Sequence, residues 1–264
     1  MIFINPQLDA TDIVTVYSEG FESKKKAGLL DRSTYAPVLD WMEKYRKINK
    51  VLDVGCFNGN FLRMARAEGW NVLGSEISAK AAAETEEECG IAVLVGDLPD
   101  LGIERFSCDV VTLFDVIEHV DDPTACLREA HRILRAGGGL YLNTPNIESI
   151  TSRLLGKEWS AIFPWHQFYF SARTIRQILE QVGFRNIRIY SYGIGPFSRF
   201  NAYRALQSEQ KIAQRRGRVR QLIGNQRALK KGAHRLLRVL NWPFYLLSAA
   251  GGNLGATMVV RAEK

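Results

Sequence analysis

Acidic side chains close four successive apolar runs in the middle of the chain. Asp53 lies near the end of the first run, and Glu76, Asp97 and Asp115 end the next three. Because the carboxyl ends of parallel strands meet at one edge of an open sheet, where such sheets bind ligands, these carboxylates are expected to converge on one crevice. Solvated loop acids are the alternative for any one of them, but four in register favour a ligand site.

Two glycines follow the first apolar run, in the sequence Asp53-Val-Gly-Cys-Phe-Asn-Gly59. Gly55 allows a tight turn from strand to helix, and Gly59 is expected to let a ligand approach the helix start, where free backbone N–H groups favour an anion. The middle glycine of a dinucleotide fingerprint is absent, which argues against a dinucleotide. Glu76 follows at a distance that suits a carboxylate accepting hydrogen bonds from both hydroxyls of a ribose.

Two histidines are placed to act on a substrate near these acids. His119 follows the fourth strand in Asp115-Val-Ile-Glu-His119, and His166 lies in the aromatic stretch Pro164-Trp-His-Gln-Phe-Tyr169. Histidine titrates near neutral pH and often acts as a general base, so either residue could take a proton from a substrate hydroxyl. The alternatives are a supporting residue beside the ligand loop for His119 and an aromatic packing cluster for His166.

Short apolar runs alternate with helix-like stretches from residue 50 onward, for example a strand at 71–76 and a helix at 79–90. This alternation predicts an α/β fold: a Rossmann-like, seven-stranded, mostly parallel sheet with helices on both faces and a basic helical insertion before the last strand. Strands at 187–190 and 257–261 are expected to complete the sheet. Residues 35–47 have the pattern of an amphipathic helix outside the alternation.

These patterns divide the chain into four parts. The expected parts are an N-terminal helical cap over 1–48, the core of the fold over 49–193, a basic amphipathic helical insertion over 194–255, and the final strand of the core sheet over 256–264. The formal net charge is +7, and residues 199–238 alone hold twelve basic side chains with a single acid, Glu209. Such a concentration of charge predicts an anionic partner, either a lipid surface or nucleic acid.

The apolar residues of the insertion favour the lipid surface. They fall largely on one helical stripe between Arg and Lys residues, and Trp242 and Tyr245 suit the headgroup level of a membrane. We therefore expect residues 204–250 to bind an anionic membrane surface; packing on the protein body and binding of RNA are the alternatives. The sequence contains no run of 18 apolar residues, so no segment is predicted to be a membrane-spanning helix. Four scattered cysteines and the absence of a signal-peptide pattern favour a cytoplasmic protein, peripheral on the inner face of the membrane.

Taken together, the motifs resemble those of class I S-adenosylmethionine-dependent methyltransferases. In order, they are VLDVGCFNGNF, GSEIS, VGDL, DVVTLFDVIEHVDDP and LREAHRILRAGGGLYLNTPN, and they cover about residues 50–146. Weaker similarity continues through His166–Ser171 and Gly183–Phe184. Within this superfamily, the chain most resembles the branch that includes the ubiquinone-biosynthesis O-methyltransferases and enzymes found with surface-polysaccharide synthesis.

The resemblance implies S-adenosylmethionine as the cofactor and suggests which residues hold it. The residues implied to hold its methionine part are Asp53, Gly55 and Gly59. Glu76 is implied to hold the ribose. Asp97 and Leu98 are implied to hold the adenine. The other positions expected in the cofactor site are Cys56, Asn58, Ile77, Phe114 and Asp115. Asn58 stands where many relatives have glycine, and asparagine tolerates positive φ better than most residues.

The residues after the fourth strand bear on the acceptor. Methyltransferases that act on amino groups of bases or glutamine often carry Asn-Pro-Pro-Tyr there, whereas this chain has Phe-Asp-Val-Ile at 114–117. We therefore expect transfer to an oxygen of a small-molecule acceptor that is lipid-linked, quinone-like or a saccharide. An RNA methyltransferase that grips RNA through the basic insertion and a non-catalytic binding protein are the alternatives.

The residues after the fourth strand could also hold a metal ion. Asp115, Glu118 and His119 could together present a divalent-metal cluster, as the resemblance to the quinone O-methyltransferases permits. With two acids three residues apart and no second histidine nearby, the sequence favours an enzyme without a metal.

Overall fold

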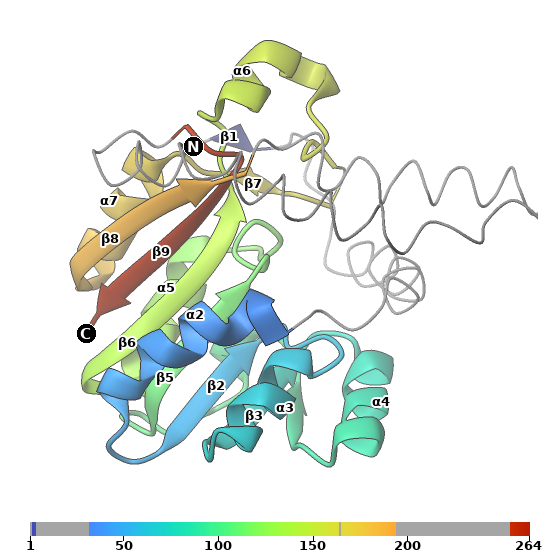
Figure 1. Cartoon of the computed structure of the whole chain (residues 1–264), viewed down its shortest axis with the longest axis vertical. Helices are drawn as coiled ribbons and strands as arrows, with labels where there is room; N and C mark the ends of the chain where they lie inside the picture. Colours follow the sequence, from blue (N-terminus) through green and yellow to red (C-terminus); the bar gives the residue numbers. More distant parts are fainter. Residues whose placement is uncertain (1, 4–31, 164, 194–253) are drawn as a thin grey trace, which may run out of the picture. The chain divides into compact units, whose positions relative to one another are not determined.

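The computed structural model describes residues 2–3, 32–163, 165–193 and 254–264 (Figure 1). The predicted basic insertion, 194–255, lies outside these residues apart from its last two positions, so the division into cap, core, insertion and final strand stays a prediction. The chain forms two compact units. The first comprises Met1–Pro145, Phe163–Ile189 and Val259–Lys264, and the second comprises Asn146–Ile162 and Tyr190–Met258. All the candidate site residues described below belong to the first unit.

A seven-stranded sheet forms the centre of the fold, in the order β4-β3-β2-β5-β6-β9-β8. Its strands are β2 (Lys50–Val54), β3 (Asn71–Glu76), β4 (Val93–Val95), β5 (Cys108–Phe114), β6 (Leu134–Pro145), β8 (Arg185–Tyr192) and β9 (Thr257–Glu263). The four pairs from β4 to β6 are parallel, and β9 runs opposite to β6 and β8 (Figure 1). The predicted seven-stranded, mostly parallel sheet is therefore confirmed.

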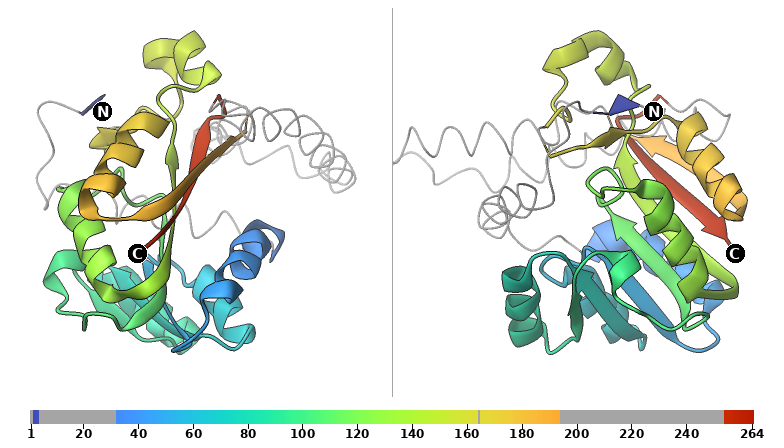
Figure 2. Two further views of the ribbon diagram at one scale, coloured as in Figure 1. Left: turned by 90° about the vertical axis from the view of Figure 1, so that its left-hand side faces the viewer. Right: turned by 180° about the vertical axis from the view of Figure 1, so that it is seen from behind.

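Helices cover both faces of this sheet, as the alternating pattern predicts. The edge-on view in Figure 2 shows α2 (Arg32–Met42) and α3 (Asn60–Ala67) on one face, and α5 (Pro123–Ile133) and α7 (Ala172–Val182) on the other. α4 (Ala79–Cys89) packs beside β3 and β4. The core between these layers is apolar, since β2 and β5 are buried almost throughout.

Local capping fixes where two of these helices begin. Asp122 accepts hydrogen bonds from the N–H groups of Thr124, at 2.8 Å, and Ala125, at 3.0 Å, and α5 starts with a proline. Ser171 forms a reciprocal capping box with Thr174 at the start of α7. Such caps satisfy backbone donors that have no partner within a helix, so the chain turns into α5 and α7 at these residues.

The strand register aligns the carboxyl ends of three strands. Val54 at the end of β2 pairs with Ser75 of β3 and with Leu113 of β5. Gly55, Glu76 and Phe114 come directly after these three paired positions and therefore meet at one edge of the sheet. Open α/β sheets bind their ligands at this edge.

Several short elements complete the described residues. They are β1 (Ile2–Phe3), η1 (Glu43–Tyr45), η2 (Leu98–Asp100), α6 (Ile150–Leu155), η3 (Gly156–Glu158) and β7 (Phe168–Tyr169). β1 pairs antiparallel with β7, a contact that the sequence did not indicate within the expected helical cap. None of the helices in the described ranges combines the length and the apolar character needed to cross a membrane.

Candidate active site

The turn between β2 and α3 contains three residues with left-handed backbone. Gly55 and Gly59 both have φ of +65°, a conformation that glycine adopts at little cost. Phe57 also has positive φ, at 53°, whereas Asn58 does not. The backbone of Asn58 therefore does not need the conformation that asparagine tolerates. The residue with the unfavourable backbone conformation is Phe57.

Packing explains the need for glycine at both positions. A Cβ at Gly59 would lie 2.9 Å from Thr85 Cγ2 and 3.2 Å from Cys89 Sγ, both on α4. A Cβ at Gly55 would lie 2.6 Å from Val116 Cγ2. The missing side chain of Gly59 therefore makes room for α4, and the expected close approach of a ligand there stays a prediction.

Cys56 and Asn58 contribute to this turn in different ways. The N–H of Cys56 donates to Ser75 O on β3 at 2.9 Å, and burial raises the pKa of the Cys56 thiol, so the group stays neutral. Asn58 Oδ1 accepts from the N–H of Asn60, at 3.3 Å, where α3 begins. Both residues therefore shape the turn between strand and helix.

Asp53 is a buried carboxyl group just before this turn. Its Oδ1 accepts a hydrogen bond of 2.7 Å from Thr112 Oγ1 on the neighbouring β5. Burial raises the pKa of Asp53 to about 8, against the lowering effect of the Thr112 hydrogen bond, and the nearby Glu76 raises it further. Asp53 is therefore mainly protonated at neutral pH, and a cation bound beside it would favour its ionised form. The sequence did not reveal Thr112, because a lone hydroxyl in an apolar strand gives no signal.

Glu76 connects the end of β3 to the turn. Its side chain is almost fully buried, and its two oxygens accept from the N–H of Phe57 at 3.2 Å and from the N–H of Ser78 at 3.1 Å. These two bonds hold the carboxylate against the turn between β2 and α3 and the start of α4. Ile77, the next residue, exposes its apolar side chain.

Asp97 and Leu98 follow β4 at the same edge. Asp97 Oδ1 accepts from the N–H of Leu98 at 2.9 Å and caps η2. Burial raises the pKa of Asp97, and Asp121 and Asp100 add to the effect, although the Leu98 hydrogen bond opposes it. Leu98 itself is buried.

Phe114 is the last residue of β5, and Asp115 follows it. Asp115 Oδ1 accepts from Asn143 Nδ2 at 2.9 Å, and the Phe114 ring lies 4.9 Å from Phe61 and 5.4 Å from Tyr35 between centroids. Burial, Asp53 and Asp115, in that order, raise the pKa of Tyr35. α2 therefore brings a tyrosine to the site edge, which the sequence did not predict because the helix lies outside the alternating pattern.

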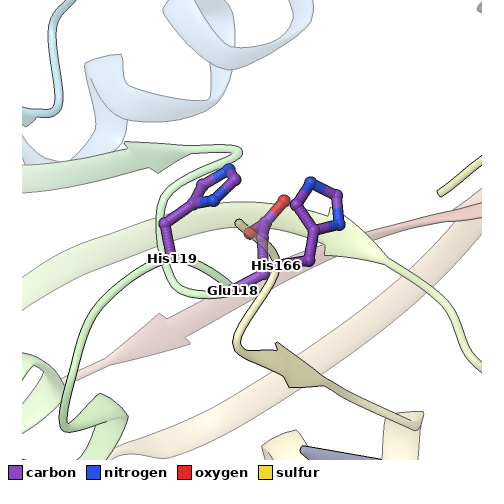
Figure 3. A group of neighbouring side chains, drawn as sticks. All are labelled: Glu118, His119 and His166. Atoms are coloured by element: carbon purple, nitrogen blue, oxygen red, sulfur yellow. The ribbon is translucent and has the colours of Figure 1, made fainter. Parts of the chain in front are cut away.

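Glu118, His119 and His166 form one cluster, shown in Figure 3. One possible ligand atom from each side chain lies within 4.8 Å of the other two, and the imidazole centroids are 4.7 Å apart. Glu118 and His166 are buried and His119 is half-buried. The sequence-based view that no second histidine is near His119 is wrong, because the chain before β7 returns to the loop after β5.

Several hydrogen bonds join these two segments, among them one of 2.9 Å that Gln167 Nε2 donates to Asp121 Oδ1. His119 Nδ1 lies 2.8 Å from the carbonyl oxygen of Trp165. The N–H of Phe168 donates to the carbonyl of Glu118 at 3.2 Å, and Gln167 Nε2 donates to the carbonyl of His119 at 3.1 Å. The relative position of the two histidines is thus set by the backbone as well as by side-chain packing.

The structure places the predicted cofactor residues at one sheet edge, in the ends of β2, β3 and β5 or in the segments that follow β2, β3, β4 and β5. It also brings His119 and His166 together beside Glu118. Which of these residues touch a cofactor or a substrate stays a prediction.

Comparison with models of known protein families shows to which family this chain belongs. A family model described as a methyltransferase domain matches residues 22–189, more than half of the chain. The chain belongs to this methyltransferase domain family. The resemblance to class I S-adenosylmethionine-dependent methyltransferases is confirmed.

Curated relatives of this methyltransferase domain match over part of its length. A ubiquinone biosynthesis O-methyltransferase of Pseudomonas aeruginosa is 30% identical over 119 residues, which is 41% of this chain and 50% of the relative. A probable S-adenosylmethionine-dependent methyltransferase of Mycobacterium tuberculosis is 28% identical over 147 residues, 55% of this chain and 52% of the relative. The chain spans about half the length of these curated relatives.

Solved structures share the fold of this methyltransferase domain. A SAM-dependent methyltransferase of Archaeoglobus fulgidus has a TM-score of 0.59 at 20% identity, covering 94% of this chain and 100% of its own. Phosphoethanolamine N-methyltransferase 2 of Haemonchus contortus, in complex with phosphomonomethylethanolamine and S-adenosylhomocysteine, has a TM-score of 0.66 at 15% identity, covering 97% of this chain and 60% of its own. At these identities, the likeness concerns the fold.

Proposed function

We propose that the chain transfers the methyl group of S-adenosylmethionine to an oxygen of a small-molecule acceptor that is lipid-linked, quinone-like or a saccharide. The observation that carries this proposal is the pairing of His119 with His166, beside Glu118, at the sheet edge that holds the acidic residues. The methyltransferase family and the partial similarity to ubiquinone biosynthesis O-methyltransferases support it.

The cofactor is proposed to lie across the ends of β2, β3 and β4. Glu76 accepts hydrogen bonds from the ribose hydroxyls, held in place by its bonds to the N–H groups of Phe57 and Ser78. Asp97 and Leu98 contact the adenine. Asp53 lies near the methionine part, whose ammonium group favours a carboxylate.

The transfer is an in-line displacement at a carbon that the sulfonium already activates. The bond between this carbon and sulfur breaks, sulfur keeps the electron pair, and the acceptor oxygen forms the new bond while its hydroxyl proton leaves. The protein therefore has to align the acceptor, exclude water and assist loss of the proton. His119 and His166 are proposed to activate the acceptor hydroxyl.

Methyl-labelled S-adenosylmethionine tests the acceptor class. The purified chain is incubated separately with a lipid extract, a dihydroxybenzoate and total RNA, and labelled product is measured in each. Label in the lipid or the aromatic hydroxyl is expected. Label in RNA alone would support the nucleic-acid alternative, and cofactor binding without label in any fraction would support a binding protein.

Substitution of the histidines tests the site itself. His119→Gln and His166→Gln are each expected to lower turnover by ~10²- to 10⁴-fold while the dissociation constant for S-adenosylmethionine stays unchanged. His131→Gln is a matched control, because this histidine packs on Phe184, with centroids 4.9 Å apart, away from the cluster. Full turnover in both cluster variants would show that the hydroxyl is activated elsewhere.

The basic segment is proposed to hold the enzyme on an anionic membrane surface. Residues 204–250 lie outside the described residues, so the support is their charge and amphipathic sequence. Each basic residue near such a surface contributes roughly 1 kcal/mol, and four or five would suffice for reversible binding. The chain should sediment with phosphatidylglycerol vesicles and stay in solution with phosphatidylcholine vesicles. No sedimentation with either, together with tight RNA binding, would refute the membrane proposal.

A further inference from the structure

The cluster of Glu118, His119 and His166 offers two imidazole nitrogens and one carboxylate oxygen within 4.8 Å of one another. Figure 3 shows the Glu118 carboxylate between the two rings. A cation with bonds of ~2.0–2.2 Å to three tetrahedral ligands needs them roughly 3.4 Å apart, so binding requires the three side chains to move closer together.

The surroundings of His119 match those of a metal-binding histidine. A carbonyl oxygen only accepts hydrogen bonds, so the 2.8 Å contact with Trp165 O assigns the proton to Nδ1. The lone pair of the neutral ring is then on Nε2, the nitrogen that can bind a cation. Metal-bound histidines usually donate their other N–H to a carbonyl or carboxylate in this way, which fixes both tautomer and ring orientation.

The backbone also holds the ligands before a cation arrives. Phe168 and Gln167 bind the carbonyl groups of Glu118 and His119, at 3.2 Å and 3.1 Å, from the same segment that carries His166. All three ligand residues are therefore fixed on two short segments that are bonded to each other. Such preorganisation lowers the conformational cost of binding.

We infer that Glu118, His119 and His166 bind one divalent transition-metal ion of the zinc class. Two imidazoles and one carboxylate favour Zn²⁺, Co²⁺, Mn²⁺ or Fe²⁺, whereas Mg²⁺ and Ca²⁺ prefer oxygen ligands alone. Three protein ligands leave a coordination position open.

The use of this open position rests on the proposed function. There, an acceptor hydroxyl bound to the cation would lose its proton to solvent more readily than a free hydroxyl, and the resulting oxygen would receive the methyl group. In this view the two imidazoles act as ligands, and the cation activates the acceptor.

Metal binding can be measured without any methyl transfer. The untagged full chain, stripped with a chelator and dialysed, is titrated with Zn²⁺ and with Mg²⁺ by calorimetry, and with Co²⁺ by visible absorption. One equivalent of Zn²⁺ should bind at least 100-fold more tightly than Mg²⁺, and Co²⁺ should show the intense bands of a low-symmetry, four- or five-coordinate site. Absence of Zn²⁺ binding, or equal affinity for Mg²⁺, would overturn the inference.

Variants connect this binding to the three residues. Glu118→Gln, His119→Gln and His166→Gln should each weaken Zn²⁺ binding at least 10-fold, whereas His131→Gln should leave it unchanged. Circular dichroism establishes that each variant is folded; the half-buried His119 is the position least needed for packing and keeps the test decisive if a buried variant unfolds. Unchanged affinity in His119→Gln would place the metal elsewhere. Zn²⁺ binding with no methyl transfer would retain the metal site and reject only the proposed function.

Discussion

The carboxylate of Glu76 accepts a hydrogen bond from the backbone N–H of Phe57, 3.2 Å away, on the neighbouring turn. Phe57 has a φ of 53°, which a bulky side chain adopts only when its surroundings hold it there. Its carbonyl oxygen also accepts from Thr85 Oγ1 at 2.5 Å. The residue proposed to bind the ribose therefore also fixes the turn that is proposed to hold the methionine part.

Replacement of Glu76 should consequently disturb two parts of the cofactor site. Glu76→Ala removes a buried acceptor and should weaken S-adenosylmethionine binding by about 2 kcal/mol or more, about 30-fold in the dissociation constant. Calorimetry measures this directly. Glu87→Ala on α4 is the control, because that glutamate is exposed and is not among the residues assigned to the cofactor. Equal affinity of Glu76→Ala and the wild type would reject the assignment.

Cofactor binding should release a proton near neutral pH. The pKa of Asp53 is about 8 in the free protein because the group is buried, and a bound ammonium or sulfonium group would lower it. Asp53 then changes from mainly protonated to ionised on binding at pH 7. Calorimetry in phosphate and in Tris should give enthalpies that differ in the direction of proton release, and Asp53→Asn should remove the difference. An enthalpy independent of buffer in the wild type would contradict the proposed place of Asp53.

Gly55 should tolerate a methyl group poorly, for two separable reasons. Gly55→Ala places a Cβ 2.6 Å from Val116 Cγ2 and requires an L-residue at a φ of +65°; the backbone alone costs ~1–2 kcal/mol. The double variant Gly55→Ala with Val116→Ala should regain part of the lost stability, because only the clash is removed. Chemical unfolding of both variants tests this. Identical stability of the single and double variants would mean that the Val116 side chain moves aside freely.

Much of the fold could be predicted because its signals are local. The expected strand at 71–76 and helix at 79–90 correspond to β3 and α4, since an apolar run, a polar break and a capping serine follow one another directly in the sequence. The acidic residues at strand ends follow from the same alternation. Local patterns therefore located the sheet edge and its carboxylates.

What could not be predicted depends on contacts between distant segments. His166 lies beside Glu118 only because the segment before β7 is hydrogen-bonded to the loop after β5, and no local pattern encodes that meeting. The glycine at 59 has a packing role that depends on α4. Tyr35 reaches the site from a helix outside the alternation. Each of these features requires the tertiary structure.

Glu263 should stabilise the protein in a pH-dependent way. On β9, it accepts hydrogen bonds from Lys44 Nζ at 2.9 Å, Tyr45 OH at 2.8 Å and Asn186 Nδ2 at 2.6 Å. The hydrogen bonds from Lys44, Asn186 and Tyr45 lower its pKa from 4.5 to about 2. A carboxylate whose pKa is lower in the folded than in the unfolded state stabilises the fold above the unfolded pKa, and this contribution is lost as the pH falls from about 4.5 toward 2.

The variant Glu263→Gln isolates this contribution. Because the side chain is partly exposed, the loss at pH 7 should be modest, about 1 kcal/mol of unfolding free energy. The difference from the wild type should shrink as the pH falls below about 4.5, since Glu263 then takes up a proton in the unfolded wild-type chain, which favours unfolding. Urea unfolding at several pH values measures it, with Glu180→Gln as a control for an exposed pair whose partner, Arg176, is 3.9 Å away. A difference that stays constant between pH 7 and pH 2.5 would show that shape and hydrogen bonding, rather than the charge of Glu263, hold β9 in place.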